Sequence, residues 1–488
     1  MKQYNNPGIF FEETIATQDG ASVTVRKPSS LGARAVTGAE MGVGAFVGIA
    51  PRGAVRKPVL VTNWTEYVNE FGAFDVNSML AYAIQGFFLN GGQKAYVVRA
   101  TKFNVAVNTA KIATLSVKDS TEQESLVVNA KNEGAWGNEI SVEVKDSTSD
   151  NFILNIYYKN VLAESYLSSL KTIEIDAEDS KLINISVTGE QKPKAVEATS
   201  LAGGVDGISG ITDQDYIDAI QTLNDVEFNN LAVPNVTTKA VHQAMDAFCE
   251  KIGRGMAYKD APPNMSTSEL ATYREGLGDS ARGRMLNTYL TVNDPIGLGK
   301  NPVKNVPSCG HVLGRVAQMQ TDNGAWTAVA GEDAKIVGIV GLAKKVSDAD
   351  IAVLNPLGIT CIKNLKNKGT VIWGARTFSS DRTMKYANIR DLTDYIEASL
   401  NQSMTWTNFK ANDERLWGMI KPNVENFLRS VWAQGGLKGE KPEEAYWVKC
   451  DAELNTPEVV DAGITYCDIG IAGAKPNEFT VFRMTINA

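Results

Sequence analysis

The sequence has 488 residues, of which 43% are hydrophobic and 21% are charged, as in ordinary globular proteins. This composition excludes wholesale disorder and collagen-like structure, and the length suggests about three domains. The 48 Lys and Arg residues are outnumbered by 56 Asp and Glu, which gives a net charge of −8. We therefore expect a soluble protein without direct nucleic-acid binding, which needs a concentrated basic surface.

Histidine and cysteine are scarce, which narrows the possible chemistry. With two histidines, a His-rich metal site is excluded, and His-dependent catalysis would have to use His242 or His311. The five cysteines are odd in number and lack Cys-x-x-Cys spacing, so we expect reduced thiols in the core rather than zinc sites or a disulfide framework. The N-terminus lacks a signal-peptide core, and no apolar run approaches the roughly 18 residues of a membrane span. We expect cytosolic synthesis and no stable membrane insertion.

The first 105 residues are predicted to contain an arm and the beginning of a compact core. Residues 1–40 form an arm and linker in which Gly8–Glu13 has the pattern of a short strand, while the following residues are polar. Residues 41–105 form the N-terminal part of an α/β core. It is predicted to have strands at 43–49, 59–61 and 95–99, and a helix capped by Asn77 and ended by Gly91.

The pattern changes twice in the middle of the chain. Residues 106–202 have closely spaced strands and few helical patterns, which predicts a β-sandwich-like insertion. Residues 203–375 alternate strands with helices, which favours a mostly parallel sheet covered on both faces. The clearest predicted elements are helices starting after Thr212 and Ser347 and at 241–252 and 270–277, and strands at 231–233, 256–258 and 289–292.

Residues 376–472 are predicted to form an α+β C-terminal domain. Asn388 and Asn412 are expected to cap two amphipathic helices, and Pro422 to kink or break the second. Strands are expected at 445–448 and 464–471. Residues 473–488 form a Gly-Pro linker and a terminal strand, Phe479–Ile486.

The sequence contains little that indicates an enzyme. His311 lies in Cys309-Gly310-His311, but no Gly-x-Ser-x-Gly elbow exists, and we interpret this histidine as a loop or strand-edge residue. His242 is expected to be a half-exposed surface residue. The sequence has no phosphate-binding glycine motif. We interpret Gly203–Gly207 as an interdomain turn. We interpret Lys363, Lys366 and Lys368 as part of the tip of a hairpin. We predict no catalytic site, no metal site and no cofactor.

The two ends of the chain are the informative features. Each has a short apolar strand beyond a linker, and such a strand is not stable alone because its backbone groups lack partners. It must add to a sheet, either in its own chain or in a neighbouring subunit. The pattern alone leaves these alternatives open.

Short motifs along most of the chain stand in an order that one family shares. They are Pro7–Glu13, Ala45–Gly53, Phe71-Gly72, Phe87–Gly92, Tyr96–Arg99, Trp373–Thr377, Tyr386–Arg390, Asn412–Glu414, Phe427-Leu428, Trp432–Gly435, Asn455–Pro457, Asp461–Gly463 and Glu478-Phe479. In this order the chain resembles the contractile tail sheath proteins of myovirus-type bacteriophages and phage-tail-like particles. Asp391 departs from the family, which usually has a second Arg there, and residues 106–202 match least, apart from Gly134–Asn138.

The resemblance implies a fold and a function. The fold is α+β and multidomain, with a β-rich insertion, a subtilisin-like α/β middle domain, a C-terminal domain nearest an inner tube, and extended terminal arms. The function is that of a structural protein of a virion tail or tail-like particle, made in the bacterial host cytoplasm. Its copies would stack as sixfold rings around the inner tail tube, with baseplate and tail terminator proteins as further partners. Contraction of this sheath would drive the tube through a cell envelope.

The resemblance also decides between the two fates of the terminal strands, in favour of exchange between subunits. The residues expected in the exchanged strands are Ile9, Phe10, Phe11, Glu12, Phe479, Val481, Phe482, Met484 and Ile486. Arg415, Lys421 and Arg429 are candidate contacts to an acidic tube, although an ordinary solvated helix face explains them equally well. The alternatives are a hydrolase that depends on His311 and a non-contractile virion component.

Overall fold

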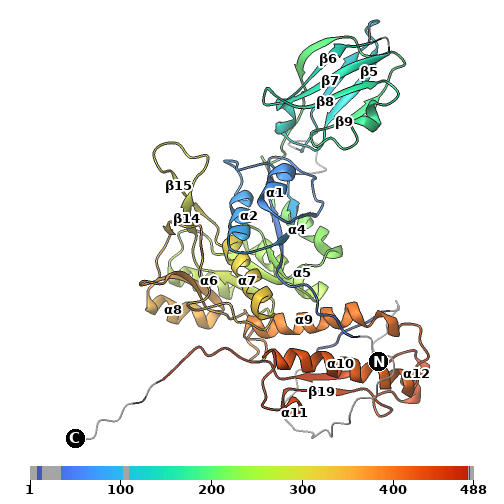
Figure 1. The fold of residues 1–488 in the computed structure, drawn as a ribbon. Coiled ribbons are helices and arrows are strands. Elements are labelled where there is room, and N and C mark those ends of the chain that lie inside the picture. Colours follow the sequence, from blue (N-terminus) through green and yellow to red (C-terminus); the bar gives the residue numbers. More distant parts are fainter. Residues whose placement is uncertain (1–7, 14–34, 103–108, 149, 482, 484–488) are drawn as a thin grey trace.

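The structure, a computed structural model, describes residues 8–13, 35–102, 109–148, 150–481 and 483 (Figure 1). A mixed α+β body carries a β-rich region at one end and a helix-rich region at the other. These are the insertion region (residues 106–202) and the C-terminal region (residues 376–472). Within the described ranges, every helix is too short or too polar to cross a bilayer.

The body is built on one eight-stranded sheet with the order β18-β17-β13-β12-β11-β1-β3-β2. Neighbouring strands are parallel except at the two edges, where β2 and β18 are antiparallel to β3 and β17. This confirms the predicted mostly parallel sheet. The strands are β1 (Val43–Gly48), β2 (Val59–Val61), β3 (Lys94–Arg99), β11 (Asn230–Ala232), β12 (Met256–Asp260), β13 (Gly283–Leu286), β17 (Ile359–Leu365) and β18 (Gly369–Trp373).

Helices cover both faces of this sheet, because successive side chains of a strand point to opposite sides. Phe46 packs into a cluster on one face, while Ala45 and Val47 pack into a cluster on the other. The first face is covered by α1 (Trp64–Phe71), α2 (Leu80–Leu89) and α7 (Cys309–Asn323). The second face is covered by α4 (Asp213–Gln221), α5 (Lys239–Ile252), α6 (Thr267–Glu275) and α8 (Asp348–Leu354).

Two predictions for the body are wrong in detail. The helix after residue 77 is capped at Met79 rather than Asn77. The strand expected at 289–292 forms, but it belongs to a separate antiparallel sheet of β15 (Val303–Val306), β14 (Leu290–Asn293) and β16 (Gly341–Leu342). Short 3-10 turns connect some of the helices and strands. They are η1 (Ala135–Glu139), η2 (Thr222–Asp225), η3 (Asn355–Leu357) and η4 (Thr405–Thr407).

The insertion region has two antiparallel sheets that share one hydrophobic cluster, as predicted for a β-sandwich-like insertion. One sheet contains β4 (Thr114–Lys118), β5 (Glu124–Ala130) and β9 (Ile183–Val187). The other contains β10 (Val196–Ser200), β6 (Ile140–Asp146), β7 (Asn151–Tyr158) and β8 (Val161–Ser169), and α3 (Ile173–Asp176) follows β8. The buried Arg99 of β3 ties this region to the body, because Nη1 donates to the carbonyls of Gly53 and Glu133 at 3.0 and 2.6 Å.

The C-terminal region packs helices and one small sheet around a single cluster. Its elements are α9 (Ala387–Ser403), α10 (Glu414–Ala433), α11 (Pro442–Ala445), β19 (Tyr446–Lys449), α12 (Pro457–Asp461) and β20 (Asp468–Ile471). The predicted caps are displaced by one or two residues: Tyr386 precedes α9, and the Asp413 side chain caps α10.

Pro422 does not break α10, contrary to one outcome that we expected. A proline inside a helix costs about 3 kcal/mol because it removes a backbone hydrogen bond and crowds the preceding turn. Ile420 and Val424, on either side of it, are buried in the C-terminal cluster. Tertiary packing of the apolar face therefore outweighs this local cost.

Candidate functional site

The two histidines considered for catalysis are both buried. His311 lies in α7 rather than in a loop, and burial lowers its pKa to about 4. Its ring packs so closely on α2 that a Cβ on Gly86 would lie 2.2 Å from Nδ1, and within the described chain this nitrogen has no hydrogen-bond partner. His242 is buried in α5, with Nδ1 2.9 Å from the Tyr273 hydroxyl, so its predicted surface position is also wrong.

The residues around His311 have a structural arrangement that sequence reasoning missed. The buried Asp260, at the end of β12, accepts hydrogen bonds from the backbone N–H groups of Ser308 and Cys309 at 2.9 and 3.0 Å. It thereby satisfies two N–H groups at the start of α7.

Across the described residues, no three His, Cys, Asp or Glu side chains gather closely enough to hold a metal ion.

The N-terminal arm lies on the C-terminal region of its own chain. Ile9 is half-buried against the cluster formed by α9, α10 and their neighbours, whereas Phe10, Phe11 and Glu12 are exposed. Residues 8–13 form no strand in this single chain. The arm therefore presents two aromatic side chains to the exterior.

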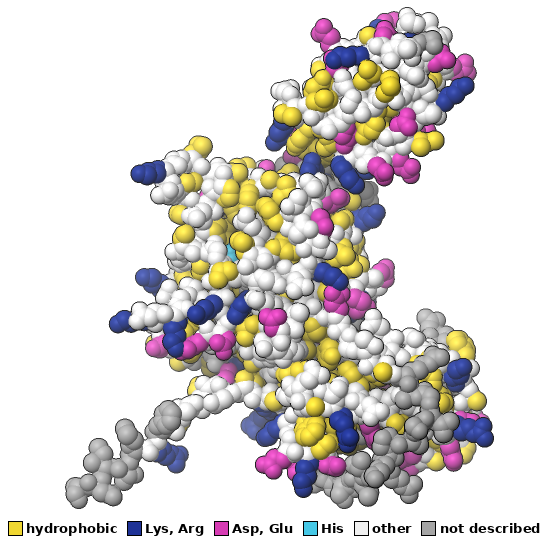
Figure 2. Space-filling model, in the orientation of Figure 1, with side chains coloured by type: hydrophobic (Ala, Val, Ile, Leu, Met, Phe, Trp, Pro, Cys, Tyr) yellow, Lys and Arg dark blue, Asp and Glu magenta, His cyan; other side chains and the backbone are white. Residues whose placement is uncertain are grey.

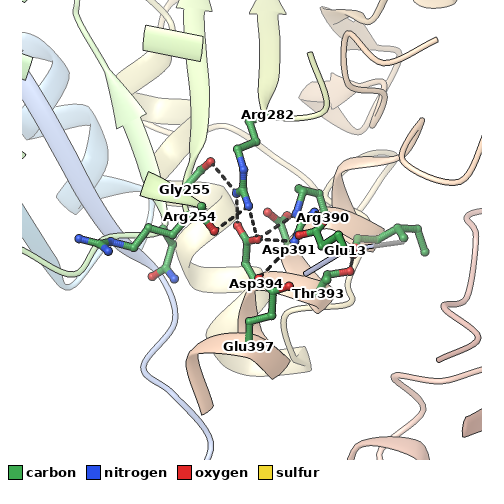
Figure 3. A network of polar contacts seen from close by, with 12 residues as sticks. Glu13, Arg254, Gly255, Arg282, Arg390, Asp391, Thr393, Asp394 and Glu397 are labelled. Carbon is green, nitrogen blue, oxygen red and sulfur yellow. Dashed lines mark hydrogen bonds and ion pairs between the residues drawn. The ribbon is translucent and has the colours of Figure 1, made fainter. Parts of the chain in front are cut away.

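Glu13, next to these residues, enters an ionic cluster on α9 (Figure 3). The side chain of Arg390 is almost fully buried and donates to Glu13 through Nη1 at 2.6 Å, while its Nη2 lies 2.8 Å from Asp394. Glu397 is 3.7 Å from the same guanidinium. Arg282 donates to both carboxylate oxygens of Asp394, at 2.6 and 2.9 Å. We call these five residues the Arg390 cluster.

Acidic groups outnumber basic groups around the Arg390 cluster. Burial, reinforced by Glu13 and Asp394, raises the pKa of Glu397 to about 8. Burial also raises the pKa of the neighbouring Asp391 to about 7, and this carboxylate accepts a hydrogen bond from Gln320 at 2.7 Å. Asp391 is the residue that departs from the family pattern, and it faces α7 through this bond.

The C-terminal arm has a similar ionic anchor. Arg376 donates through Nε to both Glu478 oxygens, at 2.9 and 3.0 Å, and the Tyr386 hydroxyl donates to the same carboxylate at 3.0 Å. Residues 479–481 run away from the body (Figure 1), with Phe479 and Val481 73% and 74% exposed. The predicted exchange residues Phe482, Met484 and Ile486 lie outside the described residues.

The small sheet of the C-terminal region has only two strands in the described chain. β19 and β20 are antiparallel, with Tyr446 opposite Ile471 and Lys449 opposite Asp468. The outer edge of each strand therefore has no partner strand within the described ranges. A two-stranded sheet is marginally stable by itself, and free edges are places where further strands add.

The three candidate tube contacts do not form one patch on α10. Arg415 and Arg429 are exposed, whereas Lys421 is half-buried and lies 3.9 Å from Glu425. At 3.6 residues per turn, Lys421 points about 120° away from Arg415 around the helix axis. On the face shown in Figure 2, acidic and basic side chains are interspersed. A contact with an inner tube stays a prediction.

Two family models match consecutive parts of the chain. The model of the phage tail sheath protein central domain matches residues 209–378, and that of the phage tail sheath C-terminal domain matches residues 379–487. The tail sheath protein of Burkholderia phage BcepMu is 24% identical over 220 residues, which are 42% of this chain and 45% of that protein. The chain thus spans about half the length of this curated relative.

Solved structures share the fold over most of the chain. The sheath complex of the extracellular contractile injection system PVC, in its contracted state, matches with a TM-score of 0.61 and 17% identity, covering 97% of this chain and 98% of that one. The sheath tail protein Lin1278 from Listeria innocua matches with a TM-score of 0.65 and 14% identity, covering 90% and 96%. Because the two family models together cover residues 209–487, more than half of the sequence, the chain belongs to the phage tail sheath family.

Proposed function

We propose that this protein is the structural subunit of a contractile tail sheath. Its copies stack in sixfold rings around an inner tail tube, and the sheath shortens to drive that tube through a cell envelope. Membership of the tail sheath family and the shared fold with a sheath solved in a contracted state support this proposal. The protein would be made in the bacterial host cytoplasm and act in a virion tail or tail-like particle, with tube, baseplate and terminator proteins as partners.

The observation that carries the proposal is the combination of the two terminal arms with the open β19–β20 sheet. Each arm has an acidic residue, Glu13 or Glu478, held by a buried arginine, and exposed apolar side chains next to it. The sheet offers two edges without partner strands in the described chain. We infer that the arms of neighbouring copies add to this sheet, which is recognition by strand addition.

The free energies expected for strand addition are large enough for a contact between copies that must survive contraction. Each large apolar side chain of an arm contributes roughly 1.5–3 kcal/mol when it is buried on a neighbour, before the cost of ordering the arm. Each added inter-strand hydrogen bond contributes roughly 0.5–1.5 kcal/mol net. Contacts of this kind would be equal in the extended and contracted lattices and would hold copies together. The switch must then lie in other contacts, which differ between the two lattices.

Each region of the chain would have its own role in the sheath. We propose that residues 203–375, with residues 41–105, form a domain of subtilisin-like fold without its chemistry, and that residues 106–202 form an inserted domain. Residues 376–472 would form the domain nearest the tube, while residues 1–40 and 473–488 act as linkers and exchanged strands. His311 gives the alternative hydrolase no support, because this residue of α7 is buried against α2.

The test of strand exchange is removal of the apolar segment with the ionic anchor left in place. Deletion of residues 479–488, or the double substitution Phe479→Ser and Val481→Ser, should give a folded chain that forms no tubes in electron micrographs. The matched control is Leu298→Ser, because Leu298 is 97% exposed on the β14–β15 hairpin, away from both arms, and should assemble normally. Tubes of ordinary length from the deletion variant would contradict the proposed role of the arm.

A further inference from the structure

Two of the five cysteines face each other at the end of the β19–β20 sheet. Lys449 pairs with Asp468 across this sheet, so the next residues in the register are Cys450 and Cys467. Both side chains point inward, because Tyr446, Val448 and Cys450 pack into the C-terminal cluster together with Cys467. Both thiols are free in the structure.

The hydrogen-bond pattern defines the kind of pair that they form. The N–H of Ala472 donates to the carbonyl of Ala445 at 2.8 Å, which marks these residues as a hydrogen-bonded pair. Such pairs alternate with non-hydrogen-bonded pairs along an antiparallel ladder, and Cys450–Cys467 is five steps further on. It is therefore a non-hydrogen-bonded pair, in which Cα atoms are about 4.5 Å apart and side chains are closest. A disulfide requires a Cα separation of about 4.4–6.8 Å.

Asn455 fixes the chain directly beyond the two cysteines. Its side chain donates to the carbonyls of Asp451 and Tyr466, at 3.1 and 3.0 Å, and accepts from the N–H of Tyr466 at 2.6 Å. Asp451 and Tyr466 are the residues that follow Cys450 and precede Cys467. The pair is thus held between the regular ladder on one side and the Asn455 bridge on the other.

The thiols also interact electrostatically. The side-chain contact with Cys467 lowers the pKa of the Cys450 thiol, whereas the same contact raises the pKa of the Cys467 thiol. Lys421 on α10 favours the thiolate form of both sulfurs. One thiolate stabilised by a neighbouring thiol is the reactive form in disulfide exchange, and Cys467, which is partly exposed, gives access to the pair.

We propose that Cys450 and Cys467 form a cross-strand disulfide when the protein meets an oxidising environment. A low-molecular-weight disulfide is the oxidant: one protein thiolate attacks it, forms a mixed disulfide and displaces one reagent thiolate. The second protein thiolate attacks the mixed disulfide at the protein sulfur and displaces the other reagent thiolate. The two reagent thiolates take up the two protons that the cysteines lose, so that the protein gains one S–S bond and the reagent is reduced to two thiols.

The bond would close the segment 450–467, which contains α12, and fix one end of the β19–β20 sheet. It would be absent in the reducing cytoplasm and form after release. Formation of the disulfide does not depend on the proposed function, and its test needs no assembled particle. One consequence does rest on the proposed function: the bond would stiffen the sheet to which a neighbour's arms add.

The test is a thiol count on the full chain, incubated with oxidised glutathione, denatured and alkylated. Before alkylation, we expect a mass about 2 Da below that of the reduced chain. After alkylation, we expect two of the five thiols to be protected and a linked peptide pair containing Cys450 and Cys467. Five alkylated thiols, or a lasting glutathione adduct on Cys467, would overturn the proposal. This measurement depends on no variant.

Variants sharpen the assignment. Cys249, Cys309 and Cys361 are buried in three other clusters, so Cys361→Ser should still lose two thiols on oxidation. Cys450→Ser should lose none to an internal disulfide and should instead keep a glutathione adduct on Cys467. Oxidation should also raise the denaturant midpoint of the wild-type chain but not that of Cys450→Ser. An equal rise in both chains would count against a bond at this pair.

Discussion

At the scale of single residues, the Arg390 cluster shows how the fold makes ordinary side chains sensitive to pH. Arg390 is surrounded by Glu13, Asp394 and Glu397 within 4 Å, and Arg282 is the second cation in contact with the group. Two arginines cannot neutralise these three carboxylates, and burial penalises the unpaired negative charge. The folded protein therefore retains a proton on Glu397 at neutral pH, where an exposed glutamate would be ionised.

This retained proton predicts how stability depends on pH. The pKa of Glu397 rises from an ordinary value of 4.5 to about 8 on folding, so between these values the folded state binds more protons than the unfolded state. Stability must then fall as the pH rises through this window. Glu397→Gln removes the titrating group, and its unfolding free energy should decline less than that of the wild type between pH 5 and pH 8, about the two ends of that window.

The measurement is chemical denaturation of both proteins across the window, monitored by circular dichroism. Glu227→Gln is the control, because the Glu227 side chain is 81% exposed and should leave the wild-type slope unchanged. A Glu397→Gln curve parallel to the wild-type curve would show that the Arg390 cluster holds no proton.

At the scale of elements, regular apolar periodicity with a clear stop signal predicted helices such as α5, whereas α1 and α7 were missed. Helix α5 and its end at Gly253, which has a positive φ, follow from apolar spacing and the glycine stop. Helix α7 has a buried apolar stripe, Cys309, Val312, Leu313 and Val316, which the sequence analysis missed because Gly310, His311 and Gly314 stand between these residues. The two glycines allow a close approach to α2, which depends on a distant segment. The Arg390 cluster could not be predicted either, because it joins Glu13 and Arg390, which are far apart in the sequence.

Two helical glycines, one packed tightly on another helix and one with open space beside it, should respond in opposite ways to the same substitution. A Cβ on Gly310 of α7 would lie 2.1 Å from the Ala83 carbonyl oxygen, whereas a Cβ on Gly418 of α10 would meet nothing within 4 Å. Gly310→Ala should therefore destabilise the protein by about 1–3 kcal/mol through overpacking. Gly418→Ala should stabilise it by roughly 0.5–1 kcal/mol, since alanine favours the helix. Unfolding midpoints in denaturant compare the two directly, and a Gly310→Ala protein as stable as the wild type would contradict the tight contact.

At the scale of the whole molecule, an arm can occupy its own chain or a neighbour's with the same contacts. The single chain shows Glu13 on its own Arg390 and Ile9 on its own C-terminal cluster. A contact of this kind can be exchanged between identical copies at little cost, because each copy loses and gains the same interactions. What the exchange adds is the strand pairing that the open β19–β20 sheet lacks in the described chain.

A charge swap distinguishes the two arrangements in the assembled sheath. Glu13→Arg alone and Arg390→Glu alone should each impair tube formation, because each places a like charge against the almost fully buried side chain at position 390. If the contact is made between copies, an equimolar mixture of the two variants should form tubes containing both, since every arm then finds a complementary site on a copy of the other kind. If the contact stays within each chain, the mixture should fail like its components. The double variant Glu13→Arg, Arg390→Glu is the control, because tubes formed by it show that the swapped pair is tolerated beside Asp394 and Glu397. Electron micrographs of the mixture, with the variants labelled differently, therefore decide whether this arm links neighbouring copies.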